Sequence, residues 1–158
     1  MEVNRTFEVY VNSPYGKTLG LEFRLTSEPV GGGSGLGTLF RRRLRIRLFA
    51  IEDGKLNPIQ MLFTLGHLQA FQLLEFLEEA AGGGSPEVLT PYARGNKKLT
   101  VSVVGEEVVL QGTGGGSVME VPLDPLRTRM VLTYLRAWVP LLGSYEWVEE
   151  CPAPQNSE

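Results

Sequence analysis

Residues 41–50 read Arg41-Arg42-Arg43-Leu44-Arg45-Ile46-Arg47-Leu48-Phe49-Ala50, and apolar residues alternate with arginines from position 43 to position 48. A period of two is typical of an antiparallel β-strand with one buried and one exposed face. Side chains two positions apart in a strand lie on the same face, roughly 7 Å from each other. The stretch therefore predicts a strand whose exposed face carries an arginine ladder: Arg41, Arg43, Arg45 and Arg47.

The same alternation recurs in other segments, which are predicted to be strands at 7–12, 19–26, 98–104, 107–111 and 118–121. An apolar-rich stretch from 58 to 81 predicts a helix, because Asn57 suits its N-cap and Pro58 its first position. Leu123-Asp124-Pro125 repeats the local pattern of Leu56-Asn57-Pro58 and predicts a second helix that stops near Pro140 and Gly143.

These segments predict an α+β fold of two antiparallel four-stranded sheets, each followed by a helix, in a twofold ββββα repeat. The repeats span about 6–81 and 88–143 and form a single domain over 1–145. Residues 146–158 are interpreted as a flexible, acidic, proline-containing tail. Three Gly-Gly-Gly-Ser runs, at 31–34, 82–85 and 114–117, are predicted to be loops. Helices that cover one face of a sheet leave its other face free for function.

Composition favours a protein without a metal or other cofactor. Cys151 is the only cysteine and His67 the only histidine among 158 residues, so we expect no internal disulfide and no metal cluster. His67 lies within the first predicted helix and is interpreted as a core or subunit-interface histidine. No residues are assigned a catalytic role, and we expect no enzymatic activity. The N-terminal segment and the lack of a long apolar stretch indicate a soluble, cytoplasmic protein with no membrane partner.

The distribution of charge indicates a polyanionic partner. The net charge is −3, yet residues 1–47 carry eight lysines and arginines against four glutamates. An arginine ladder repels itself unless counter-charge lies along it. The alternative reading is a solvated strand whose arginines pair with Glu8 and Glu22.

Aromatic residues accompany this charge, and bases stack on aromatic rings for roughly 1–3 kcal/mol each without reading sequence. Tyr10, Tyr15 and Phe49 are predicted on or beside the ladder, with Lys17 and Arg24 on the same sheet. A second cluster opens the second repeat: Tyr92, Arg94, Lys97 and Lys98. Together with the ladder, these residues form the predicted nucleic-acid-binding site.

Several strings resemble motifs of the Whirly family of single-stranded DNA-binding proteins, in the same order over most of residues 7–145. Tyr15-Gly16-Lys17-Thr18-Leu19 resembles the Lys-Gly-Lys-Ala-Ala motif, with Tyr15 where the family has a lysine. Leu56-Asn57-Pro58-Ile59-Gln60 is similar to the family's Leu-Ser-Pro-Thr-Glu helix start. Glu75-Phe76 matches a Glu-Phe pair, and Val139-Pro140-Leu141-Leu142-Gly143 resembles the closing Leu-Pro-His-Leu-Ile-Gly.

The resemblance implies two sheets packed by helices in a homotetramer, with single-stranded DNA bound across the sheets of neighbouring subunits. It implies little sequence preference, a DNA contact for Lys17 and a stacking role for Tyr15. The expected function is therefore DNA protection, repair, recombination or replication in a bacterial or phage-encoded setting. Two alternatives stay open: binding of single-stranded RNA, and a module that contacts replication, repair or transcription proteins through the acidic tail.

Overall fold

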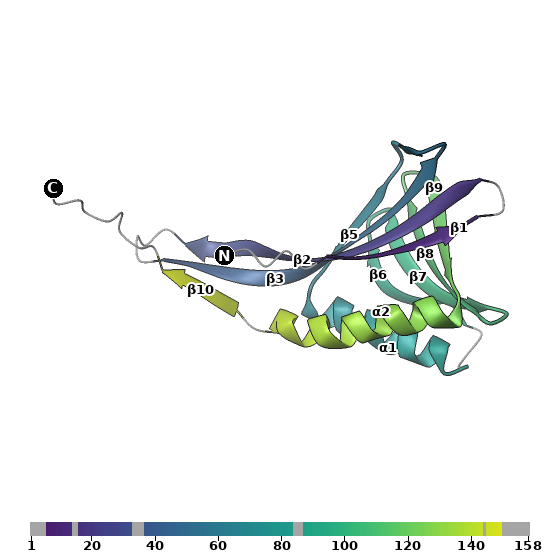
Figure 1. Ribbon diagram of the computed structural model, residues 1–158. Helices are drawn as coiled ribbons and strands as arrows, with labels where there is room; N and C mark the ends of the chain where they lie inside the picture. The colour runs from purple at the N-terminus through teal and green to yellow at the C-terminus, as the bar shows by residue number, and fades with distance from the viewer. Residues whose placement is uncertain (1–5, 14–15, 33–36, 84–86, 144, 150–158) are drawn as a thin grey trace.

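A computed structural model of the chain describes residues 6–13, 16–32, 37–83, 87–143 and 145–149. Within these ranges the fold is α+β and contains two antiparallel sheets and two α-helices (Figure 1). The predicted fold class is confirmed at this level. Tyr15, Cys151 and the end of the predicted tail from residue 150 lie outside the described residues.

The first sheet is built around two long strands, β2 (Lys17–Gly32) and β3 (Gly37–Glu52). Strand β1 (Thr6–Asn12) pairs with β2. Three further strands pair with β3 along its other edge: β4 (Lys55–Leu56), β5 (Met61–Leu65) and β10 (Tyr145–Glu149). This sheet has six strands where four were predicted, because β4 and β10 both join it.

The second sheet has four strands in sequence order: β6 (Leu89–Arg94), β7 (Lys97–Val104), β8 (Glu107–Gly114) and β9 (Ser117–Leu123). Helices α1 (His67–Ala81) and α2 (Pro125–Trp138) lie side by side along one end of the two sheets (Figure 1), and the short 3-10 helix η1 (Val139–Gly143) follows α2. Neither α-helix has the length and apolar character needed to cross a membrane.

The core lies between the two sheets and the helices. The inward residues of β3 (Leu44, Ile46 and Leu48) are fully buried, and so are Leu73 of α1 and Leu110 of β8. Burial of apolar side chains stabilises a fold by about 25 cal/mol per Å² of surface removed from water. The alternation in 43–48 therefore fixes which face of β3 is buried and leaves the arginines on the opposite face.

The first helix begins nine residues later than the sequence predicted. Residues Met61–Leu65 form β5, which pairs with Leu44–Leu48 of β3, and α1 starts at His67 with Gly66 as its N-cap. Met61, Phe63 and Leu65 point inward, an alternation that is hidden in a run also compatible with a helix. Asn57 caps only a turn, through a 2.9 Å hydrogen bond that its side chain accepts from the Ile59 amide. The Whirly-like string at 56–60 therefore does not begin a helix.

His67 is the first residue of α1 and is exposed, so the core alternative for this histidine is wrong, and the subunit-interface alternative stays a prediction. The second helix begins as predicted. Asp124 is its N-cap and accepts a 2.7 Å hydrogen bond from the Arg127 amide, with Pro125 in the first turn. An aspartate at this position is among the most favourable N-caps, because it satisfies an amide that has no partner within the helix.

The tail prediction is wrong for residues 146–149, which belong to β10. This strand pairs with Gly37–Arg41 of β3. Together with residues 26–32 of β2 and 37–43 of β3, it forms a three-stranded extension that we call the arm. The arm projects away from the two packed sheets (Figure 1). Tyr145, Trp147 and Val148 are residue types enriched in β-strands, and this enrichment is the strand signal.

Gly20 makes room for an aromatic ring on the outside of the first sheet. It lies opposite Phe49, and a Cβ at position 20 would stand 2.2 Å from Cζ of the Phe49 ring. Phe49 is only 2 % exposed. The ring therefore lies across the Gly20 backbone and covers a part of the strand that has no side chain.

Gly20→Ala is expected to lower the free energy of unfolding by about 1–3 kcal/mol, because the added methyl group must displace the Phe49 ring. Once Phe49→Ala has removed the ring, adding Gly20→Ala should cost little more. Chemical denaturation of the two single variants and the double variant measures this coupling. Losses that simply add would contradict the packing of Phe49 on Gly20.

Candidate nucleic-acid interface

The outer face of the first sheet, opposite the core, collects most of the predicted cationic residues. All four arginines of the ladder lie on this face of β3, and Arg24 of β2 joins them opposite Arg45. Tyr10 of β1 lies on the same face opposite Gly20. Acidic residues on this face of the described strands include Glu8, Glu22 and Glu28.

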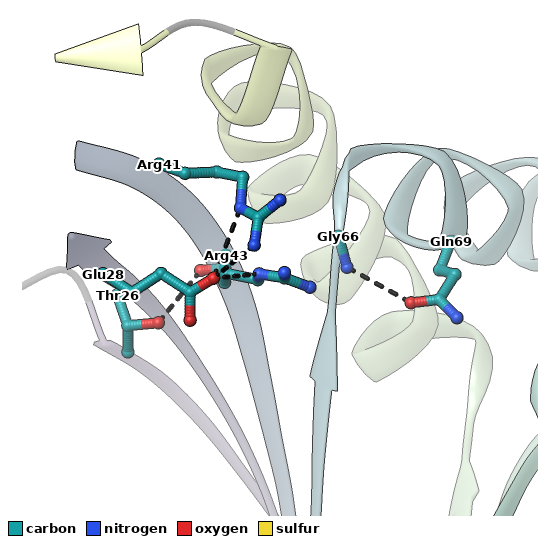
Figure 2. Close-up of polar contacts among 6 residues, drawn as sticks. All are labelled: Thr26, Glu28, Arg41, Arg43, Gly66 and Gln69. Atoms are coloured by element: carbon teal, nitrogen blue, oxygen red, sulfur yellow. Dashed lines mark hydrogen bonds and ion pairs between the residues drawn. The ribbon is translucent and has the colours of Figure 1, made fainter. Parts of the chain in front are cut away.

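Two arginines of the ladder converge on one carboxylate. Arg41 Nη2 lies 2.7 Å from Glu28 Oε1, and Arg43 Nε lies 2.8 Å from the same oxygen (Figure 2). Thr26 also donates a 3.4 Å hydrogen bond to the Arg43 carbonyl. The Glu28 side chain is 42 % exposed, so these pairs lie in contact with water. Exposed ion pairs contribute little to stability and exchange readily with other anions.

These contacts set the charge state of Glu28. The hydrogen bonds from Arg41 and then from Arg43 hold the pKa of Glu28 below its ordinary value of 4.5. This pKa is lower in the folded chain than in the unfolded chain. The interaction therefore stabilises the fold fully at pH values above the ordinary pKa. That contribution is lost as the pH falls through the lowered pKa.

Arg47 is held more tightly than the other arginines. Its Nη2 lies 3.1 Å from Glu22 Oε2, and Glu22 is only 6 % exposed. Its Nη1 donates to Gln60 Oε1 at 3.1 Å, and its guanidinium carbon lies 4.2 Å from the centre of the Phe49 ring. Arg47 is therefore held by contacts within the chain. Its ion pair with Glu22 is the pairing that the alternative of a solvated strand predicts.

Arg24 and Arg45 differ from their neighbours. They stand directly opposite each other on β2 and β3, and across the described ranges neither forms an ion pair with a carboxylate. The Nε of Arg24 is buried and has no hydrogen-bond partner, a feature that it shares with the Nε of Arg47, but Arg47 also has the carboxylate of Glu22 as a partner. Like charges directly opposite in a sheet are destabilising, and an unpaired buried donor adds a further cost. This pair forms an uncompensated positive site at the middle of the outer face.

The predicted aromatic partners are only partly available on this face. Tyr10 is 42 % exposed, whereas the Phe49 ring is buried between Gly20, Tyr10 and Arg47, so its predicted role in base stacking is wrong. The Tyr10 hydroxyl donates a hydrogen bond to Glu8 Oε2, which raises the pKa of Tyr10 above 10.0. Tyr10 therefore remains a neutral, partly exposed ring beside the arginines.

Lys17 lies on the opposite side of the sheet from the ladder. It pairs with Glu52 at 2.8 Å and lines a groove of about 320 Å³ together with Leu19, Ala50 and Met119. The reason is its odd position in β2, which it shares with the inward residues Leu19 and Leu21. Lys17 therefore belongs to the same sheet as the arginine ladder, as expected, but it lies on the other face of that sheet.

The second predicted cluster lies on the second sheet. Tyr92 pairs with Leu99 and is 8 % exposed, with its ring 5.5 Å from that of Phe63 in the core, so it is not available to stack on a base. The exposed Arg94, Lys97 and Lys98 lie at the β6–β7 turn, and Lys97 Nζ donates a 3.2 Å hydrogen bond to the Leu62 carbonyl of β5. This cluster is separate from the outer face of the first sheet.

Two further aromatic residues share the outer face: Tyr145, at the end of the predicted domain, and Trp147, which falls within the predicted tail. Tyr145 lies opposite Arg41 and Trp147 opposite Leu39, and their exposed fractions are 58 % and 51 %. The aromatic and β-branched residues within 145–149 are the sequence signal for this placement. The outer face thus runs from Trp147 on the arm, past the arginines, to Tyr10.

No group of three or more candidate metal ligands occurs among the residues that the structure describes. No protein-family model matches the chain, and no curated protein or solved structure shows significant similarity to it. The functional interpretation therefore depends on the chain's own geometry.

Replacing Arg41 by glutamine is expected to raise the pKa of Glu28 toward its ordinary value, because the strongest of its hydrogen bonds is removed. A carbon-detected NMR titration of the glutamate and aspartate carboxyl groups measures this midpoint. The internal control is Asp124, whose pKa is lowered chiefly by the Arg127 amide and should not move. An unchanged Glu28 midpoint in the variant would show that the Arg41 contact is not formed in solution.

Proposed function

We propose that this protein binds single-stranded DNA on the outer face of its first sheet, with little sequence specificity, and acts without catalysis in DNA protection, repair, recombination or replication. The observation that carries this proposal is the Arg24–Arg45 pair, two arginines at directly opposite positions of β2 and β3 with no carboxylate partner in the described chain. A phosphate supplies the acceptors and the negative charge that this pair lacks.

The surroundings of this pair suit a flexible polyanion. Arg41 and Arg43 share a water-exposed carboxylate, so a phosphate group can replace Glu28 at little cost. Tyr10, at the other end of the face, offers a partly exposed ring for a base. Phosphate contacts carry no sequence information, and stacking is tolerant of base identity, which is why the proposed binding has little specificity.

The fold that we propose is Whirly-like. Strands β1, β2, β3 and β5 precede α1, and β6–β9 precede α2, an order that fits a ββββα unit used twice. In this description β4 and β10 are additions to the first unit.

Replacing Arg45 by glutamine is expected to weaken binding of a single-stranded dT oligomer roughly tenfold or more, since a hydrogen bond to a charged group contributes about 1.5–3 kcal/mol. The same substitution should leave thermal stability unchanged or slightly higher, because it relieves the repulsion with Arg24. Arg129→Gln, at an exposed position of α2, removes the same charge away from the sheet and serves as the control.

Fluorescence anisotropy at several salt concentrations measures both effects. Each phosphate that the outer face neutralises should add about −0.7 to the slope of log affinity against log salt, so Arg45→Gln should make the slope shallower by about 0.7. Competition with a matched RNA oligomer decides between DNA and RNA. Equal binding by wild type and Arg45→Gln would remove this pair from the interface.

We further propose that the chain assembles as a homotetramer through its helices. Leu68 and Phe71 lie one turn apart on α1 and are 78 % and 48 % exposed, and Leu126 and Met130 form a similar stripe on α2. Apolar stripes of this kind are typical of surfaces that a second subunit covers.

Light scattering should therefore give a mass close to four times 17.4 kDa. The combined substitution Leu68→Glu/Phe71→Glu should reduce that mass, because charged side chains would be buried in the interface. Glu79→Ala, on exposed surface near the other end of α1, is the control. A wild-type mass of a single chain would contradict this assembly.

A further inference from the structure

The arm carries two exposed aromatic residues that the proposed phosphate site does not use. Tyr145 and Trp147 of β10 lie on the same face as Arg41, because residues opposite each other in antiparallel strands point to the same side. Strand β10 is also an addition to the proposed twofold plan of four strands and a helix. These two rings therefore call for a separate explanation.

The Trp147 ring is held in place from below. A Cβ at Gly37 would stand 2.6 Å from Cζ2 and 2.8 Å from Cε2 of the Trp147 ring, so the ring packs directly on the β3 backbone. Even so, Trp147 remains 51 % exposed. A large ring supported on one side and open to water on the other is a ready platform for another flat group.

The charged residues beside the Trp147 ring indicate which kind of flat group would stack on it. Arg41 lies opposite Tyr145 and Arg43 follows it along β3, and both contact only the exposed Glu28 carboxylate among the ion pairs of the described chain. Cationic side chains that track a backbone, next to rings on which bases stack, are the combination found in proteins that bind single strands. The occupant that matches both the rings and the charge is an unpaired base of a nucleic acid.

We propose that Trp147 and Tyr145 form a base-stacking subsite on the arm, and that this subsite makes the interface selective for single strands over duplexes. The inference rests on the proposed function. It extends the site from Tyr10 to Trp147, a stretch of about ten β3 residues or roughly 33 Å. Bases paired within a duplex do not present their faces, so a duplex can contact only the arginines.

Tryptophan fluorescence tests the subsite directly, because the chain has two tryptophans in different settings. Trp138 is 7 % exposed and Trp147 is 51 % exposed. A single-stranded dT oligomer should quench the emission of wild type and of Trp138→Phe, in which Trp147 is the only tryptophan. It should not quench Trp147→Phe. A duplex of the same length, and an abasic oligomer that offers phosphates without bases, should leave the emission of Trp138→Phe unchanged.

Affinity provides a second readout. Trp147→Ala should weaken dT binding roughly 5- to 150-fold while leaving the salt dependence unchanged, since stacking neutralises no phosphate. Trp147→Phe keeps a ring on the strand and should retain most of the affinity. This conservative variant separates loss of stacking from loss of the β3–β10 pairing.

The outcomes distinguish this subsite from the phosphate site. If dT binding depends on Arg45 but neither quenches Trp147 nor weakens in Trp147→Ala, the subsite is wrong and the proposed function stands. If no oligomer binds at all, the proposed function fails together with the subsite. Equal quenching by the duplex, or an emission shift of Trp147 with protein concentration alone, would show that the ring serves another partner and would overturn the assignment.

Discussion

Between residues 43 and 48, strand β3 buries the side chains of one face completely and keeps arginines on the other face. Its inward residues Leu44, Ile46 and Leu48 are fully buried, and the period of the strand places Arg43, Arg45 and Arg47 on the opposite face. A register shift of one residue would bring guanidinium groups into the core, which is far more costly than any rearrangement outside it. This constraint fixes the sheet, the position of the helices against its inner face, and the cationic character of its outer face.

Some of the arginines on the outer face are neutralised by carboxylates and others are not, and this difference indicates where a ligand binds. Glu28 neutralises part of the charge of Arg41 and Arg43, and Glu22 pairs with Arg47. Arg24 and Arg45 face each other without such a partner in the described part of the chain. A sheet selected for stability alone would place opposite charges there. Departures from local rules are expected at functional sites, where stability is given up for binding.

Local patterns predicted much of this structure and missed what depends on pairing between distant segments. The alternation in 43–48, the cap at Asp124 and the two-sheet α+β class are confirmed. The stretch from Met61 to Leu65 was assigned to a helix, because an apolar run fits either structure until its partner strand is known. The site was only partly predictable for the same reason, because its composition depends on which strands pair. That pairing buries Phe49 and places Lys17 on the other face from the arginines. It also brings Trp147 to the arginines' face.

The most direct test of the central claim observes the two guanidinium groups themselves. Arginine side-chain Nε–Hε resonances can be followed by NMR while a single-stranded dT oligomer is added. Saturable chemical-shift changes are expected for Arg24 and Arg45 at one common affinity. The Nε proton of Arg24 should become protected from exchange with water, and the resonance of Arg129 should not shift. Binding of the oligomer without any change at Arg24 and Arg45 would contradict the central claim.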